Sequence, residues 1–201
     1  MVAIHGATES PGIEAKGGGG RTIEGRGNQP FILMIIAPSQ FRDEELFVPQ
    51  AIFTQAGYVV DIASKGVQRS KGVMGKEAVV SCSFDAVKAE GYDAVILVGG
   101  GGAQVYWEDI SLHSFLKEAY NGKKVIGAEC IAPVILANAG LLTGKKATVW
   151  KSEGVRLQAK GVQYTGESVT VDGSIVTSNG PQAAEAFARK IVSLLEKKAQ
   201  N

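Results

Sequence analysis

Short apolar runs alternate with helical patterns along most of this 201-residue chain, and that alternation restricts its fold more than any other feature. Strands are predicted at FILMIIA (31–37), YVVDIA (58–63), DAVILVGG (93–100) and KVIGAEC (124–130). The first and third runs are apolar over enough consecutive residues to be buried on both faces, which is typical of parallel strands. Helices are predicted between them, each closing on a glycine that can take a left-handed cap, at RDEELFVPQAIFTQAG, SFDAVKAEG and SLHSFLKEAYNG. The alternation predicts an α/β fold, doubly wound around a mostly parallel central sheet with helices on both faces.

The C-terminal part continues this pattern and the N-terminal part lacks it. APVILANAGLL predicts a helix, VTVDGSIVTS (169–178) predicts a hairpin turning at Asp172 and Gly173, and PQAAEAFARKIVSLLEKKA predicts a last helix. Residues 1–30 contain KGGGGRTIEGRGNQP, where IEGR is also the factor Xa recognition sequence used to remove tags. We therefore treat residues 1–30 as a flexible leader, added with a tag or a native tail, and residues 31–201 as one domain.

Composition excludes several classes of function. The chain has 21 basic and 20 acidic residues, so it offers no charged footprint for nucleic acid or an anionic membrane. It has no run of the ~18 apolar residues that a membrane-spanning helix needs, and its N-terminus lacks the apolar core of a signal peptide. Two unpatterned cysteines indicate a reducing compartment, simplest as the cytoplasm. No cluster with metal-ligand spacing is present, so we expect no metal.

Cys130 stands where the fourth apolar run gives way to a helical pattern. Pro133 suits the first turn of a helix, where proline needs no backbone N–H partner. Unpaired N–H groups and the helix dipole at such a start lower the pKa of a thiol, so a low-pKa thiolate is expected on a nucleophile elbow. The alternative is that Cys130 is buried filler, a common fate of cysteine and the role we assign to Cys82.

Glu45 lies near the middle of an apolar helix face. At about 100° per residue, that face carries Phe41, Glu45, Val48, Pro49, Ile52 and Ala56. A carboxyl group buried there must be neutral, paired or strained. It could donate a hydrogen bond to a thiolate or move a proton to a substrate, since this helix starts at the same sheet edge as Cys130. The alternative is an exposed first-turn acid, favoured by the helix dipole.

Four glycines, 99 to 102, follow the third apolar run directly. Their backbone amides could approach a ligand, and an oxyanion or carbonyl pocket around Gly99 and Gly100 fits better than a phosphate loop or a dinucleotide fingerprint, whose further residues are missing. Cysteine hydrolases usually activate the thiol with histidine. The two histidines here are His5, in the leader, and His113, for which we predict a surface or packing role.

These residues resemble the ThiJ/PfpI superfamily, which includes PfpI-type intracellular proteases and the parkinsonism-associated protein deglycase. The resemblance covers about residues 31–196 and is carried, in order, by FRDEELFVP, DAVILVGGGGAQ, AEC before a helix, and VTVDGSIVTSNGP. It implies a flavodoxin-like sandwich that forms homodimers or larger homo-oligomers and needs no cofactor. It also implies that Cys130 is the nucleophile, that Glu45 is its acidic partner, and that Gly99 and Gly100 border the pocket.

Three positions depart from the family pattern. Protease-like members carry histidine directly after the nucleophile, where this chain has Ile131, so peptide hydrolysis is in doubt. Deglycase-like members have a histidine in the following strand, where this chain offers Trp150, which could wall the pocket but cannot act as a base. Glu129, directly before Cys130, is unusual, and it is either part of the site or a solvated acid at the strand end.

Three hypotheses follow for function. The first is a glyoxalase or deglycase-like enzyme, in which the Cys130 thiolate attacks a small reactive carbonyl compound and Glu45 moves protons. The second is a redox-sensing stress protein or chaperone that works through oxidation of Cys130. The third is a PfpI-type protease or amidase acting on a peptide-like substrate, which Ile131 disfavours.

Overall fold

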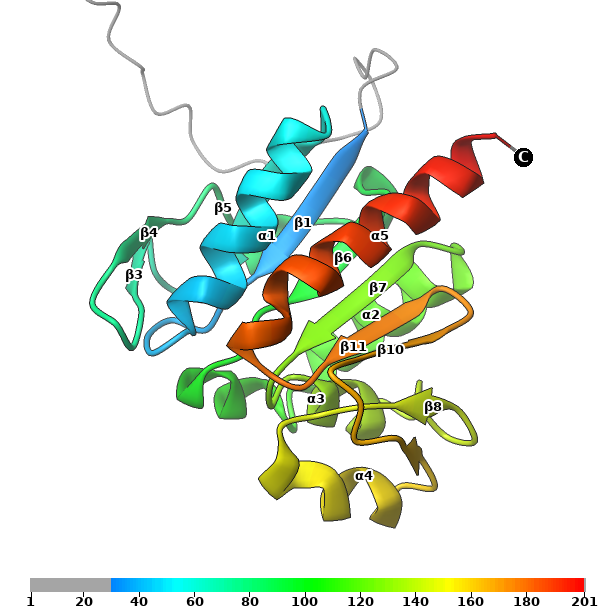
Figure 1. The fold of residues 1–201 in the computed structure, drawn as a ribbon. Helices are drawn as coiled ribbons and strands as arrows, with labels where there is room; N and C mark the ends of the chain where they lie inside the picture. Colours follow the sequence, from blue (N-terminus) through cyan, green and yellow to red (C-terminus); the bar gives the residue numbers. More distant parts are fainter. Residues whose placement is uncertain (1–29, 201) are drawn as a thin grey trace, which may run out of the picture.

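The computed structural model describes residues 30–200 of the chain (Figure 1). These residues include a seven-stranded sheet with the strand order β10-β11-β7-β6-β1-β2-β5. Every neighbouring pair is parallel except β10 and β11, which are antiparallel. The strands of this sheet are β1 (Phe31–Ile35), β2 (Val59–Ser64), β5 (Cys82–Ser83), β6 (Ala94–Leu97), β7 (Val125–Glu129), β10 (Val169–Asp172) and β11 (Ile175–Ser178). The predicted doubly wound α/β fold is confirmed, while the proposed leader lies almost entirely outside the described residues.

Helices cover both faces of the sheet and enclose two apolar cores. Figure 1 shows α1 (Asp43–Gln55) and α5 (Ala184–Ala199) side by side on one face, with α2 (Ile110–Asn121) and α3 (Pro133–Asn138) behind the other. Alternate residues of β1 serve the two cores: Ile32 and Met34 pack toward α1 and α5, while Leu33 and Ile35 pack on the opposite face. Burial on both faces explains why this strand is apolar throughout.

Two local predictions are wrong. SFDAVKAEG, predicted as a helix, forms two 3₁₀ turns, η1 (Phe84–Ala86) and η2 (Ala89–Gly91). Its apolar side chains dock at the sheet edge, and so short a segment cannot offset the cost of nucleating an α-helix. The expected left-handed glycine cap is present after α1, at Gly57 (φ +88°). After α2, however, Gly122 keeps φ −72° and Lys123 takes the left-handed conformation.

Short elements surround the carboxyl ends of the central strands. They are β3 (Arg69–Lys71), β4 (Glu77–Val79), η3 (Gly101–Tyr106), β8 (Lys146–Ala147), η4 (Lys151–Glu153), α4 (Gly154–Ala159), β9 (Gln163–Tyr164) and η5 (Pro181–Ala183). The β3–β4 hairpin is fixed to the start of α1, because the buried Asp43 carboxylate accepts hydrogen bonds from the N–H groups of Met74 (2.7 Å) and Lys76 (2.9 Å). The predicted hairpin at 169–178 is also present, as β10 and β11.

Candidate active site

Three segments that the sequence singled out meet at the carboxyl edge of the sheet. Cys130 follows β7, Gly99 follows β6, and Glu45 lies in the first turn of α1, which follows β1. A Cβ atom placed on Gly99 would lie 2.5 Å from both the Cys130 Cβ atom and the Glu45 Oε2 atom. Only a residue without a side chain leaves room for the acid and the thiol to approach each other here.

Cys130 occupies a strained turn between β7 and α3. Its φ angle is +56°, in the left-handed region that non-glycine residues rarely adopt. Hydrogen bonds fix the turn on both sides: the Ala132 N–H donates to the Glu129 carbonyl oxygen (2.9 Å), and the Trp150 N–H donates to the Cys130 carbonyl oxygen (2.7 Å). The backbone therefore forms an elbow that presents the thiol toward a cavity, although only 9% of the surface of Cys130 is exposed.

Glu45 is fully buried beside this thiol. Its Oε2 atom accepts a hydrogen bond from the Gly99 N–H (3.1 Å), and its carboxyl group interacts with the Cys130 thiol. Its Oε1 atom has no hydrogen-bond partner among the described residues. Burial outweighs these contacts and raises the pKa of Glu45 from 4.5 to about 8, so the carboxyl group holds a proton at neutral pH.

The expectation of a low thiol pKa is wrong for the resting pair. Burial and the charge of the nearby Glu45 carboxylate raise the pKa of the Cys130 thiol from 9.0 to about 12, although the N–H groups of Gly100 and Ile131 act in the opposite direction. The amides at the helix start are visible in the sequence, whereas the burial of the thiol beside Glu45 is not. At neutral pH the pair therefore holds both protons, and the first proton lost on raising the pH leaves Glu45.

The thiol opens into a cavity of about 410 Å³, which suits a small molecule. Of the predicted pocket residues, Gly100, Ile131 and Trp150 line it, whereas Gly99 and Glu129 do not. The N–H group of Gly99 is engaged by Glu45, and Glu129 is fully buried on β7 rather than solvated at a strand end. Gly101, one of the four glycines noted in the sequence, also lines the cavity. The lining residues that the sequence did not reveal are Arg42, Val73, Gln104, Ser152, Glu153, Pro181 and Gln182. Their loops meet only in the folded chain, although Arg42, Gln104 and Pro181 lie within motifs that were noticed.

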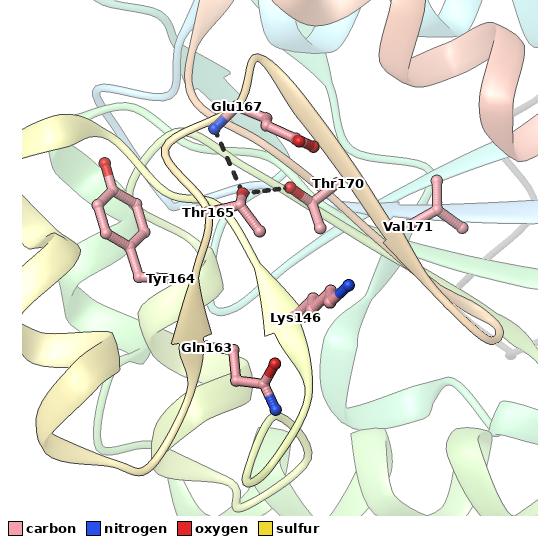
Figure 2. A pocket seen from close by; sticks show the side chains of 7 residues that line it. All are labelled: Lys146, Gln163, Tyr164, Thr165, Glu167, Thr170 and Val171. Atoms are coloured by element: carbon pink, nitrogen blue, oxygen red, sulfur yellow. Dashed lines mark hydrogen bonds between the residues drawn. The ribbon is translucent and has the colours of Figure 1, made fainter.

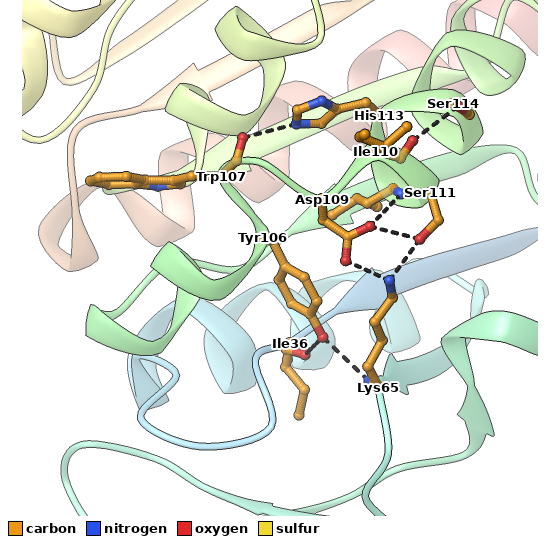
Figure 3. Close-up of polar contacts among 10 residues, drawn as sticks. Ile36, Lys65, Tyr106, Trp107, Asp109, Ile110, Ser111, His113 and Ser114 are labelled. Atoms are coloured by element: carbon orange, nitrogen blue, oxygen red, sulfur yellow. Dashed lines mark hydrogen bonds and ion pairs between the residues drawn. The ribbon is translucent and has the colours of Figure 1, made fainter.

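Polar contacts hold the segment that includes Trp107, Asp109 and His113 in place (Figure 3). Trp107 packs against Cys130 and Ile131, and its carbonyl oxygen is bound by the His113 Nε2 atom at 2.9 Å. Lys65 bonds to Asp109 at the start of α2, as Figure 3 shows. The His113 ring is therefore bound to the Trp107 carbonyl oxygen, and within residues 30–200 no histidine contacts the thiol.

A second hollow, of about 450 Å³, lies between β8, β9 and β10 (Figure 2). Its polar groups bond to one another: the hydroxyl groups of Thr165 and Thr170 are 2.6 Å apart, and the Glu167 N–H donates to the Thr165 hydroxyl oxygen (3.3 Å). Among its lining residues there is neither a cysteine nor a buried polar atom without a partner. We therefore place the candidate active site at Cys130.

Between residues 30 and 200, no group of three or more histidine, cysteine or acidic side chains is arranged to hold a metal ion. In the same part of the chain, no helix has both the length and the apolar character needed to cross a membrane.

The fold and the elbow define a class: a doubly wound α/β protein that presents a cysteine to a small cavity beside a buried acid. Residues 31–194 match the model of the DJ-1/PfpI family, and the chain belongs to that family. An uncharacterized protein of Methanocaldococcus jannaschii, MJ0967, is 40% identical, with 83% of this chain and 82% of that protein aligned. The deglycase PH1704 of Pyrococcus horikoshii is 29% identical, over 82% and 99% of the two chains.

The architecture also matches a solved structure. A ThiJ/PfpI domain protein from Brachyspira murdochii superimposes with a TM-score of 0.82 at 30% identity, covering 85% of this chain and 99% of the other. Other family relatives are named deglycases, a general stress protein and a putative cysteine protease. The family assignment and the flavodoxin-like sandwich predicted from the sequence are thereby confirmed.

Proposed function

We propose that this protein is a cysteine-dependent enzyme of the glyoxalase or deglycase kind that converts small 2-oxoaldehydes. The observation that carries the proposal is the buried Glu45 carboxyl group in contact with the Cys130 thiol at the inner end of a small cavity. Isomerisation of a 2-oxoaldehyde needs one nucleophile and one group that accepts and returns protons, and this pair supplies both. Relatives named deglycases support the same choice.

The first step joins the sulfur atom to the aldehyde carbon. The ionised Glu45 carboxylate takes the thiol proton as the carbon–sulfur bond forms, and the electron pair of the carbonyl bond moves to oxygen. Glu45 then returns the proton to that oxygen, which gives a hemithioacetal. The N–H groups of Gly100 and Ile131, which lie near the sulfur, stabilise the developing negative charge.

The second stage moves a proton between the two carbons. Glu45 removes the proton from the carbon attached to sulfur and delivers it to the neighbouring carbonyl carbon. The hydroxyl proton of the hemithioacetal passes to the neighbouring oxygen, so one carbon is oxidised to the thioester carbonyl and the other is reduced to an alcohol. The product is a thioester of a 2-hydroxy acid. Water hydrolyses it, which releases the acid and restores the thiol, and no external oxidant or reductant is consumed.

The peptidase alternative has less support. Ile131 lines the cavity directly after the nucleophile, and His113 binds the Trp107 carbonyl oxygen instead of the thiol. A Cys–His mechanism therefore lacks its base among residues 30–200. The redox alternative needs a thiolate in the resting protein, which burial and the acid beside the thiol disfavour. The cytoplasmic location and the homo-oligomeric state remain predictions.

Methylglyoxal consumption and formation of the 2-hydroxy acid test the proposal. We expect turnover by the unmodified protein, turnover at background level for Cys130→Ser, and unchanged turnover for the matched control Cys82→Ser, because Cys82 lies at the sheet edge away from the cavity. Equal rates for the unmodified protein and Cys130→Ser, or no turnover by either, would reject it.

A further inference from the structure

Glu129 is a second buried acid beside the candidate active site. It is the last residue of β7, and none of its surface is exposed. The Ser178 hydroxyl on the neighbouring strand β11 donates to its Oε2 atom (3.3 Å). Its Oε1 atom has no hydrogen-bond partner among the described residues. A buried carboxyl oxygen without a partner is costly, so this atom requires an explanation.

The main chain of Glu129 lies next to Glu45, across Gly99. The Gly99 Cα atom is so placed that an added Cβ would lie 2.5 Å from Glu45 Oε2 and 2.6 Å from the Glu129 carbonyl oxygen. The charge of Glu45 also acts on the Glu129 carboxyl group. Each of the two acids keeps one oxygen atom, Oε1, without a partner. A proton on the Glu129 carboxyl group would remove the cost of leaving a charged oxygen atom buried without a partner.

No cation in the described chain neutralises Glu129. The charged groups at the start of α5, Glu185 and Arg189, are exposed and pair with each other. On the α1 side, Arg42 is paired with Glu44 at the cavity rim. The charge of Arg42 favours ionisation of Glu45 but is outweighed by burial, so the two neighbouring buried acids are not both ionised near neutral pH.

We propose that Glu129 is a neutral carboxylic acid that donates a hydrogen bond to Glu45 and so positions the carboxyl group that acts on Cys130. Burial, followed by the charge of Glu45, holds the pKa of Glu129 well above its ordinary value. When Glu45 ionises, the O–H group of Glu129 therefore donates a hydrogen bond to the carboxylate and stabilises its buried negative charge. Glu129 is a positioning residue, because it reaches the thiol only through Glu45.

This inference rests on the proposed pairing of Cys130 with Glu45, and it is tested without a carbonyl substrate. The rate of Cys130 alkylation by iodoacetamide is measured against pH in a Cys82→Ser background, with Glu129 intact, as Glu129→Leu and as Glu129→Gln. Leucine removes the donor, whereas glutamine keeps an N–H donor but cannot release a proton. A failed methylglyoxal assay leaves this readout unaffected.

The three roles that Glu129 could have give different profiles. If Glu129 is a neutral donor, Glu129→Leu should move the midpoint of the plot of alkylation rate against pH to higher pH. Alkylation near pH 7.5 should then slow about tenfold, while Glu129→Gln stays close to the parent. A repelling carboxylate predicts that both variants move the midpoint to lower pH. A purely structural role predicts that neither variant moves it. The second and third results would overturn the proposal.

Infrared spectroscopy gives a second readout if Glu129→Leu does not fold. At about pH 9.5, above the pKa of Glu45, the parent protein is expected to retain the carbonyl band of one protonated carboxylic acid. This band is expected to be missing in Glu129→Gln. Absence of the band in the parent protein would contradict a neutral Glu129.

Discussion

Replacing Glu45 with glutamine is expected to make the protein more stable at neutral and alkaline pH. Glutamine has nearly the same shape, and its amide oxygen can still accept the hydrogen bond that the Gly99 N–H donates to Oε2. It cannot ionise. The variant therefore removes the cost of keeping a buried acid protonated, or of burying its charge, while leaving the packing unchanged.

The size of the effect follows from the pKa of Glu45, which is 4.5 ordinarily and about 8 in the folded protein. Below pH 4.5 the acid is protonated in both the folded and the unfolded state, so it does not affect stability. As the pH rises from 4.5 to 8, only the unfolded chain loses the proton, which lowers the free energy of unfolding by about 1.4 kcal/mol for each pH unit. At pH 7 the cost is about 3 kcal/mol, and it levels off near 5 kcal/mol above pH 8.

Urea unfolding of the parent protein and Glu45→Gln at pH 4.5, 7 and 9 measures this difference directly. The gap between the two curves is expected to be near zero at pH 4.5 and to widen in favour of the variant up to pH 8. A gap that does not depend on pH, or a variant that becomes less stable as the pH rises, would show that Glu45 is not held protonated by burial.

Four further outcomes are expected. Turnover of methylglyoxal should rise as the pH passes about 8, where Glu45 becomes a base, and a pH-rate profile measures this. Gly99→Ala should lose several kcal/mol of stability and most activity, because its Cβ atom would lie 2.5 Å from atoms of Glu45 and Cys130. The matched control Gly101→Ala, whose Cβ atom would have its nearest neighbour at 3.7 Å, should leave the free energy of urea unfolding nearly unchanged. Asp43→Ala should release the β3–β4 hairpin, detected as faster proteolysis within residues 72–76. Phe187→Ala should cost about 3–5 kcal/mol in the same unfolding assay, because this ring is fully buried between α5 and the sheet.

The central strands could be predicted because both of their faces are buried. A strand such as β1 must be apolar at every position, and this pattern is visible without the structure. The β10–β11 hairpin was equally visible, because Gly173 (φ +59°) supplies the conformation that its turn requires. The η1–η2 segment could not be assigned, since its apolar spacing suits a helix and only docking against the sheet edge selects two turns.

The candidate site shows a similar division. Cys130 and Glu45 were visible because each residue type stands in an unusual setting, a thiol at a strand end and an acid on an apolar face. The raised thiol pKa depends on burial and on an acid 85 positions away in sequence, which the local pattern does not contain. The partnership of Glu129 with Glu45 likewise arises only when β7 and α1 pack together.

The central claim is that Cys130 forms a covalent adduct with a carbonyl compound and that Glu45 is needed to carry the adduct onward. NMR spectroscopy of ¹³C-labelled methylglyoxal added to Glu45→Gln, with Cys130→Ser as the control, measures this directly. We expect a hemithioacetal carbon signal that builds up more slowly in Glu45→Gln, which lacks the base for the first step, and then persists there. The signal is expected to be missing in Cys130→Ser and to give way to 2-hydroxy acid only in the parent protein. Formation of 2-hydroxy acid by Glu45→Gln at the parent rate, or an identical adduct in Cys130→Ser, would contradict it.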